Sequence, residues 1–570
     1  MLPTTEKLLQ LDLFRGKVDS LSMHDRISLA YHRARVIART YGFTVKDVLE
    51  LTPKFWQYHQ DLINPLDMAA FTLITIQYNL CAGTLAPFIS DRVDLEELME
   101  QILNFDVSAQ FLLTEVGHGL DARNLETTAT LLPNGGFELH TPHRNAAKYM
   151  PPTSPQVGFP RVAIVIARLL VDSKDRGTRP FIVWLNDGYR MRQGVHIRVL
   201  PRRAGSKPLD HCITMFDHIR LPRTALLGVL PGQYDPSSDF HLTISRVHVG
   251  TLALSTTLIP ILKRAVFVAG KYSFRRHVLG SGKDRKPIIT FRTQQRPILH
   301  TLSQIAVYEC YAQWSIRGFI DTGLDYRVRH GIATAFKAVV TQAAQASLFA
   351  LAERCGAQGL FEYNNIIESQ LEARGISIAE GDTLALCIRL ASELLIGRYT
   401  MPAPKDISCM LAKYEDGIYR VCTKILKSLH EGHRSDEYNT QILPHCQVLV
   451  EAIGHRMAYE SARDTGIDKD LLALYEAGVL LHAPAWYVKS ACLDIKSQFV
   501  CEAKAMNSIL PRLDQLLDET GAGPYCTAPI ITDEDWHSFV DGLQGYGTEQ
   551  EDTVPDIHEY ILNRSFRSRL

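Results

Sequence analysis

The spacing of apolar residues changes along the chain and predicts where helices give way to strands. From residue 1 to about 110, apolar positions recur at helical spacing, and the helix predicted over 25–41 ends at Gly42. Thr44 and Asp47 then match a capping box, which marks the start of another helix. Residues 1–110 are therefore expected to form an N-terminal helical domain.

Extended patterns replace the helical spacing at about Thr127. Two short extended runs flank Pro-Asn-Gly-Gly at 133–136, a composition typical of a β-hairpin. Further runs of strand length follow, separated by glycine, proline and aspartate, and the last ends near Leu227. We expect a central antiparallel β domain over residues 111–228.

Helical spacing returns at about Ser245 and continues to Tyr399, which predicts a helical bundle over residues 229–400. Met-Pro-Ala-Pro-Lys at 401–405 indicates a hinge, and helical patterns resume after it. About fifty residues at the end mix glycine, proline and acidic residues, so we expect them to be irregular. The predicted fold class is α+β, mostly α, with residues 401–570 as an additional helical domain.

Composition narrows the classes of partner. The 570 residues include 61 Lys and Arg against 62 Asp and Glu, without the basic excess of a nucleic-acid binder, so no nucleic-acid partner is expected. The longest stretch without a charged residue, Met68–Ser90, contains Gln77 and Asn79, which favours a buried helix and turn over a membrane span. Eleven dispersed cysteines without a CxxC spacing predict neither a disulfide framework nor a metal site, and indicate a reducing compartment.

Two short motifs resemble known sites but lack their context. Gly117-His-Gly119-Leu-Asp-Ala122 fits a dinucleotide-binding fingerprint, yet strands follow it where a helix is required, so a Rossmann fold is disfavoured. His430-Glu-Gly-His433 is one residue short of a zinc-binding HExxH motif and has no evident third ligand. We interpret it as a solvated helix end.

Three separated segments carry short motifs in a fixed order. Residues 113–119 (LTEVGHG) and 125–130 (LETTAT) precede Thr141-Pro and Lys148; Tyr272-x3-Arg276-x3-Gly280 follows; Cys355-Gly-Ala-Gln-Gly359 and Glu380-Gly-Asp382 come last. The first set resembles the flavin-side loop of the peroxisomal acyl-CoA oxidases, and the last resembles the CGGxG and EGD motifs of that family. The middle segment is similar to the YxxxRxxFG sequence shared with acyl-CoA dehydrogenases. This resemblance covers nearly the whole chain.

The resemblance implies an FAD-dependent α,β-dehydrogenation of an acyl-CoA to the trans-2-enoyl thioester, with electrons passed to molecular oxygen to give hydrogen peroxide. Glu380 would be the base that removes the α-proton. Its surroundings suit this role, because apolar neighbours would raise its pKa while the start of the helix predicted at Leu384 would favour the carboxylate. The alternative is that Glu380 and Asp382 only cap that helix.

The resemblance also implies a set of cofactor-binding residues. Thr114 and the backbone from Val116 to Gly119 would contact the isoalloxazine, and Arg276 would meet the FAD diphosphate of a neighbouring subunit in a homodimer. The full set is Thr114, Gly117, Gly119, Arg276, Gln294, Gly356, Gly359 and Asp382. The alternatives left open are a tight turn at Gly117 and Gly119, an exposed helix charge at Arg276 and a polar turn at Gln294.

Departures from the family pattern keep two further functions open. Tyr149-Met-Pro-Pro152 stands where the family has WWPG, and Pro152 has no amide hydrogen to donate to a flavin. Val278 and Leu279 replace Gln and Phe of the arginine motif. The chain could therefore be an acyl thioester dehydrogenase with another electron acceptor or a role in specialised metabolism. It could also be a catalytically silent scaffold homologue.

The last three residues, Ser568-Arg569-Leu570, resemble an SKL-type peroxisomal signal. A receptor reads such a tripeptide through a free carboxylate on a flexible tail. We therefore expect recognition by the peroxisomal import receptor, localisation in the peroxisome and a role in fatty acid metabolism.

Overall fold

The N-terminal helices begin and end where local sequence signals predict. The structure, a computed structural model, describes residues 5–15, 18, 21–205, 208–230, 243–280 and 284–545. Helix α2 (Met23–Tyr41) ends at Gly42, whose φ of 54° is left-handed. Thr44 and Asp47 form both hydrogen bonds of the predicted capping box at the start of α3 (Val45–Leu49). The other helices here are α1 (Asp12–Arg15), α4 (Pro53–His59), α5 (Met68–Thr75), α6 (Gly83–Leu85) and α7 (Glu96–Leu103).

The largest sheet among the described residues is mixed, whereas an antiparallel domain was predicted. Strands β1 (Ser108–Leu112) and β2 (Thr128–Leu131) both pair in parallel with β5 (Arg161–Val171), at successive positions along it. Strand β6 (Lys174–Asn186) pairs antiparallel with β5 over its length, so β1 and β2 share the opposite edge. An alternating pattern specifies the buried face of a strand but not the direction of its neighbour, which is why the parallel pairs were missed.

The remaining strands are antiparallel, as predicted. The hairpin expected around 133–136 consists of β2 and β3 (Phe137–His140), and β9 (Ile219–Leu221) extends the same sheet beyond β3. The second sheet has the order β4-β8-β7, formed by β4 (Lys148–Pro152), β8 (His211–Phe216) and β7 (Val195–Val199).

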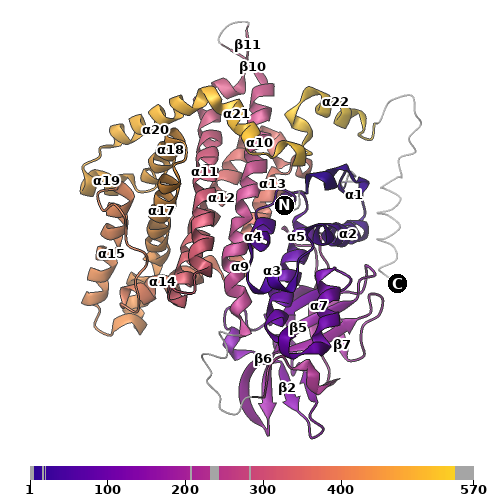
Figure 1. Ribbon diagram of the computed structural model, residues 1–570. Coiled ribbons are helices and arrows are strands. Elements are labelled where there is room, and N and C mark those ends of the chain that lie inside the picture. The colour runs from indigo at the N-terminus through magenta and orange to yellow at the C-terminus, as the bar shows by residue number, and fades with distance from the viewer. Residues whose placement is uncertain are drawn as a thin grey trace, which may run out of the picture.

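Long helices form the rest of the molecule (Figure 1). Helices α10, α11 and α12 stand side by side at its centre, between the strands with the N-terminal helices on one side and α15, α17 and α18 on the other. The central helices are α9 (Ser245–Thr256), α10 (Leu258–Arg275), α11 (Arg292–Ile320), α12 (Tyr326–Arg354), α13 (Ile366–Ile378) and α14 (Thr383–Leu395). The outer ones are α15 (Met410–Ser428), α16 (Asp436–Gln441), α17 (Cys446–Thr465), α18 (Lys469–Leu480), α19 (Pro484–Ala491), α20 (Ile495–Ile509) and α21 (Leu513–Glu519).

Two elements were not predicted. A small hairpin, β10 (His277–Leu279) with β11 (Arg285–Pro287), interrupts the helical region after α10. Helix α22 (Asp533–Asp541) lies in the C-terminal segment expected to be irregular, and the Thr532 side chain caps it by accepting from the Asp535 amide. Strands of three residues give no usable alternation. In α22 the apolar residues Trp536, Phe539 and Val540 do have helical spacing, but they follow an acidic first turn in a segment rich in glycine and proline, and the pattern was overlooked.

Among the residues that the structure describes, three helical stretches are long and apolar enough to cross a membrane: Met68–Asp91, Ser245–Arg275 and Tyr326–Arg354. A bent pair, Lys469–Leu480 with Pro484–Ala491, passes the same test as a fourth. In the first three stretches, 83%, 94% and 72% of the apolar 18-residue segment is buried inside the protein. Their apolar surfaces therefore pack against other parts of this chain.

Candidate active site

Glu380 occupies a sharp turn between α13 and α14. Its φ of 50° and the φ of 96° at Gly381 are both left-handed, a conformation that is costly for a glutamate. The turn directs the carboxylate against α9 at Gly250, where a Cβ atom would lie 1.3 Å from Glu380 Oε2. Only glycine at position 250 leaves room for the carboxylate in this position.

The carboxylate is held by Asn79, which precedes Glu380 by 301 positions in the sequence. Its Nδ2 donates to Glu380 Oε2 at 2.7 Å and lies 3.1 Å from the Arg246 carbonyl oxygen. Arg246 Nε in turn donates to the Asn79 carbonyl at 2.8 Å, in space that a Cβ at Gly83 would occupy. Asn79 lies in a π-helical segment, Ile76–Ala82, a local distortion frequent at functional sites.

The electrostatics of Glu380 are those of a proton-transfer group. The residue is half-buried, but its carboxylate lies among interior atoms, and this burial raises the pKa of Glu380 to about 8. The positive charges of Lys337 and Arg246 and the Asn79 hydrogen bond oppose the rise in this pKa. A carboxyl group with a pKa near neutrality can both accept and release a proton, which is the property required of a general base.

Asp382 caps α14, a role that the sequence left open for both Glu380 and Asp382. Its side chain accepts a hydrogen bond from the Ala385 amide at 3.0 Å and thereby caps α14. Glu380 does not cap this helix, because its carboxylate is held by Asn79 instead. The predicted contact of Asp382 with a cofactor stays a prediction.

A second group of predicted residues lines a cavity of about 640 Å³ at the end of α10. Arg276, the Cys355–Gln358 loop and Arg285 contribute to its walls. Arg276 is exposed and makes no ion pair with any described residue, and Gly356 has a φ of 59° with no atom within 4 Å of a Cβ position. Unpaired guanidinium groups beside an open backbone suit a phosphate-bearing ligand.

Gln294 and Gly359 hold this loop rather than open into the cavity. Gln294 Nε2 donates to Ser273 Oγ at 2.8 Å and to the Arg354 carbonyl at 2.9 Å, joining α10, α11 and the end of α12. A Cβ at Gly359 would lie 2.0 Å from the Ala352 carbonyl oxygen, so the close approach expected there is to α12. Neither residue is among those that line the cavity. Cys355 is buried and burial raises the pKa of its thiol to about 12, as expected of a packed residue.

The flavin-side motif residues converge on one buried ion pair. Lys148 Nζ lies 2.9 Å from Glu115 Oε1, and neither side chain is exposed to solvent. Glu115 also accepts from the amides of Glu126 and Thr127 at 2.8 and 3.0 Å. The pair therefore fixes the loop after β1 against the segment that leads into β2.

The amides within this loop are largely occupied. Those of Val116 and Gly117 donate to the carbonyls of Ala147 and Asn145 at 2.9 and 2.7 Å, so they are not free to donate to a flavin as the resemblance implied. Gly119 is exposed with no atom within 4 Å of a Cβ position. The Thr114 hydroxyl has no hydrogen-bond partner among the residues that the structure describes. No hydrogen bond or ion pair within the described ranges joins this loop to Glu380 or Arg276.

Pro152, which departs from the family pattern, lies on a sheet edge together with Pro151. Strand β4 is the outer strand of its sheet and its pairing with β8 is irregular between Tyr149 and Pro152. Met150, inside this irregularity, has a φ of 69°. An edge position tolerates proline because no ladder hydrogen bond is lost there.

One group of possible metal ligands occurs in the part of the chain that the structure describes: His140, Asp217 and His218. The two imidazole rings are stacked, with centroids 3.8 Å apart and planes 17° from parallel. A ring nitrogen binds a metal through a lone pair in the plane of its ring, so stacked rings do not converge on one ion. The His430–His433 motif is on a short turn after α15 with both histidines exposed.

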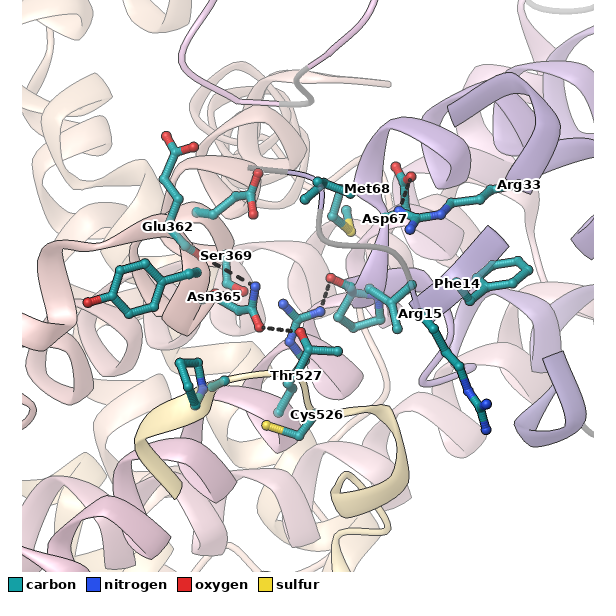
Figure 2. A pocket seen from close by; sticks show the side chains of 18 of the residues that line it. Phe14, Arg15, Arg33, Asp67, Met68, Glu362, Asn365, Ser369, Cys526 and Thr527 are labelled. Atoms are coloured by element: carbon teal, nitrogen blue, oxygen red, sulfur yellow. Dashed lines mark hydrogen bonds and ion pairs between the residues drawn. The ribbon is translucent and has the colours of Figure 1, made fainter. Parts of the chain in front are cut away.

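A further cavity, of about 350 Å³, lies between the N-terminal helices, α13 and the C-terminal segment (Figure 2). Arg33 pairs with Asp67 at 3.0 Å on one wall, and Thr527 donates to Asn365 Oδ1 at 3.2 Å on another. Its lining includes none of the residues predicted for catalysis or cofactor binding.

Four residues around Glu380 were missed from the sequence: Asn79, Arg246, Lys337 and Gly250. They come from three segments far apart in the chain. The one local signal for them was a polar amide in the apolar stretch Met68–Ser90, which was interpreted as a mark of a buried helix and turn.

This chain is similar to known proteins in both sequence and fold. Residues 249–395, which contain Glu380, match the family described as acyl-CoA oxidase, C-alpha1 domain. Acyl-coenzyme A oxidase 2, peroxisomal, of Arabidopsis thaliana is 23% identical over 414 residues, 67% of this chain and 59% of that protein. Peroxisomal acyl-coenzyme A oxidase 1 of the same organism is 27% identical over 308 residues, 50% of this chain and 46% of that protein. The chain thus spans about half the length of these curated relatives.

The fold is that of acyl-CoA oxidase crystal structures. The structure of acyl-CoA oxidase 1 from Yarrowia lipolytica superposes with a TM-score of 0.82 at 17% identity, covering 99% of this chain and 92% of that one. Acyl-CoA oxidase 1 of Arabidopsis thaliana gives a TM-score of 0.69 at 17% identity, covering 95% of each chain. In its matched segment, its relatives and its fold, the chain is therefore similar to the acyl-CoA oxidases.

Proposed function

We propose that this chain is an FAD-dependent acyl-CoA oxidase that converts an acyl-CoA to the trans-2-enoyl thioester and passes the electrons to oxygen, forming hydrogen peroxide. The observation that carries the proposal is the position of the Glu380 carboxylate, which accepts a hydrogen bond from Asn79 Nδ2 at 2.7 Å. Glu380 lies within the segment that matches the oxidase family. Burial raises the pKa of Glu380 to about 8, a value suited to a base that works near neutral pH.

Glu380 removes the α-proton of the thioester in this proposal. Asn79 and the Gly250 backbone fix the carboxylate in one position, so little reorientation is needed when the substrate arrives. Lys337 and Arg246 keep positive charge near the carboxylate, which limits the rise of its pKa and preserves a fraction of the ionised form.

The cavity beside Arg276 is the proposed place for the diphosphate of FAD. Arg276 and Arg285 supply positive charge, and the Gly356 backbone leaves open space beside them. When bound there, FAD would supply the acceptor for the hydride from the β-carbon and the route of the electrons to oxygen. Two crystal structures of related Caenorhabditis elegans acyl-CoA oxidases are described as complexes with FAD, which supports the choice of cofactor. Thr114, with its unpaired hydroxyl, is the proposed donor on the β-domain side.

We further propose a homodimer located in the peroxisome. The exposed position of Arg276 supports a contact with a cofactor carried by a second subunit. Relatives named as peroxisomal support the compartment. Ser568, Arg569 and Leu570, the proposed signal for the import receptor, lie outside the described residues.

The test is a visible spectrum of the purified protein with and without a panel of acyl-CoAs in air. We expect a flavin band that bleaches with at least one thioester and returns with release of peroxide. In Glu380→Gln the band should remain but bleaching should be lost. Turnover retained in this variant would refute the role of Glu380, and a protein that takes up no FAD would favour the scaffold alternative.

The departure at Pro152 gives a second candidate, a dehydrogenase with another electron acceptor, because this position has no amide hydrogen to offer a flavin. Comparing turnover in oxygen with turnover in an artificial electron acceptor under nitrogen separates the two. An oxidase regenerates its flavin in air alone, whereas the alternative requires the added acceptor.

A further inference from the structure

Lys337 packs against the turn that contains Glu380. It belongs to α12, its side chain has no exposed surface, and its ammonium group donates to the carbonyls of Ala379 and Gly381, each at 2.6 Å. These are the residues immediately before and after Glu380. One cation therefore spans the peptide units on both sides of the proposed base.

The carbonyl of Glu380 itself is fixed by another helix. Thr251 Oγ1, on α9, donates to this oxygen at 2.8 Å. Three consecutive carbonyls are thus held by two side chains from α9 and α12. This accounts for the left-handed φ of 50° at Glu380, because a strained backbone persists only where its surroundings determine it.

The charges around this turn come from three elements. Facing Glu380 are Lys337 from α12 and Arg246 from α9, while Lys337 also faces Asp382 and the Cys387 thiol of α14. Lys337 makes no ion pair closer than 4 Å with a carboxylate of the described residues, so its attachment is to the backbone. Its removal would take this donor from the carbonyls of Ala379 and Gly381 and withdraw a positive charge from the base.

We propose that Lys337 is a positioning residue for the catalytic base. Its ammonium group donates hydrogen bonds to the peptide units on either side of Glu380, and these bonds set the direction of the carboxylate. Lys337 also supplies a positive charge near the base. The catalytic meaning of this inference rests on the function proposed above. Lys337 contacts the backbone of the base and touches neither the substrate nor the reacting atoms, so it acts through Glu380.

The test compares Lys337→Met and Lys337→Arg with the wild-type chain. Methionine has a similar length without charge or donors, whereas arginine keeps both. The first readout is the titration of the Glu380 carboxyl group by difference infrared spectroscopy, with its band assigned by its absence in Glu380→Gln. The second is kcat and KM for flavin bleaching by the acyl-CoA that reacts fastest with the wild type. Lys271→Met removes a lysine from a surface ion pair with Asp514 and serves as the control.

In Lys337→Met we expect the Glu380 titration to move to higher pH by roughly one unit or more, because a neighbouring positive charge is lost. We expect kcat to fall by at least about tenfold with little change in KM. In Lys337→Arg the titration should stay near the wild-type position. A side chain that served only to support the fold would lower thermal stability without moving the titration.

An unmoved titration in Lys337→Met, or an equal shift in Lys337→Arg, overturns the inference whatever the activity. If Lys337→Met does not fold, Lys337→Gln, which is neutral but keeps donors, takes its place. A titration that moves as expected in a protein that oxidises no acyl-CoA supports the role of Lys337 and refutes the proposed function, so the two failures are distinguishable.

Discussion

Asn79 and Glu380 are 301 positions apart in the chain, yet Asn79 Nδ2 donates to Glu380 Oε2 at 2.7 Å. The contact joins the first helical region to the turn between α13 and α14. An amide donor stabilises the ionised form of a carboxyl group, so this bond favours the form of Glu380 that can take up a proton. Asn79 is therefore as much a part of the site as the acid itself.

Replacing Asn79 by leucine should make Glu380 a poorer base at neutral pH. A hydrogen bond to a charged group contributes about 1.5–3 kcal/mol, so its loss raises the pKa of Glu380 by roughly one to two units. The ascending limb of the kcat–pH profile should move to higher pH by the same amount. Thr84→Ala is the control, since the Thr84 hydroxyl donates to the Leu80 carbonyl at 2.6 Å in the same helical stretch. A limb that stays in place in Asn79→Leu would contradict the role of Asn79.

A single methyl group at Gly250 should lower the catalytic rate on the order of 10²-fold while sparing the fold. The Cβ of an alanine would lie 1.3 Å from Glu380 Oε2, so the carboxylate must leave its position. Displacement of a reacting group by an ångström costs on the order of 10²-fold in rate. Alanine also favours the helical conformation, by about 1 kcal/mol over glycine.

The matched control for this substitution is Gly375→Ala in α13, where a Cβ has no neighbour within 4 Å. Initial rates of peroxide release and melting temperatures of the two variants give the comparison. Gly250→Ala should be folded but slower on the order of 10²-fold, and Gly375→Ala should be folded and as active as the wild type. Normal turnover in Gly250→Ala would mean that Glu380 works from another position.

Asp382 can be tested for its cap and for its predicted cofactor contact separately. Asp382→Ala removes the bond to the Ala385 amide and should lower the free energy of unfolding by about 1 kcal/mol. Asp382→Asn keeps a good capping residue and should lose much less. FAD affinity, measured by titration of the apoprotein, then separates the roles: weakened binding in Asp382→Asn indicates a direct contact, whereas unchanged binding leaves the cap as its function.

Local sequence signals predicted the parts of the fold that depend on neighbouring residues. The end of α2 at Gly42, the capping box of Thr44 and Asp47, and the hairpin of β2 and β3 each depend on a few consecutive residues. The same holds for the cap at Asp382, which lies three residues before the amide that it binds. Such features were predictable because their interactions lie within a single turn of the chain.

The surroundings of the candidate base could not be predicted in this way. Asn79, Arg246 and Lys337 meet Glu380 only after α9, α12 and the π-helical segment have packed together, and no spacing in the sequence relates them. The cofactor residues show the same limit. Gln294 and Gly359 fit the family motifs, yet the structure uses their polar group and small size to hold a loop.

The raised pKa of Glu380 predicts that ionisation of this carboxyl group, which its role as a base requires, destabilises the folded chain. With a pKa of about 8 in the folded chain and an ordinary value of 4.5, the folded state keeps a proton that the unfolded state has released between these two values. Wild-type stability therefore falls as pH rises through this window, by at most about 1.4 kcal/mol per unit for this group. Glu380→Gln has no such titration, so its stability relative to the wild type should grow from pH 4.5 to 8 and then level off. Urea denaturation of both proteins across this range measures the difference, and a difference independent of pH would contradict the burial of the charge.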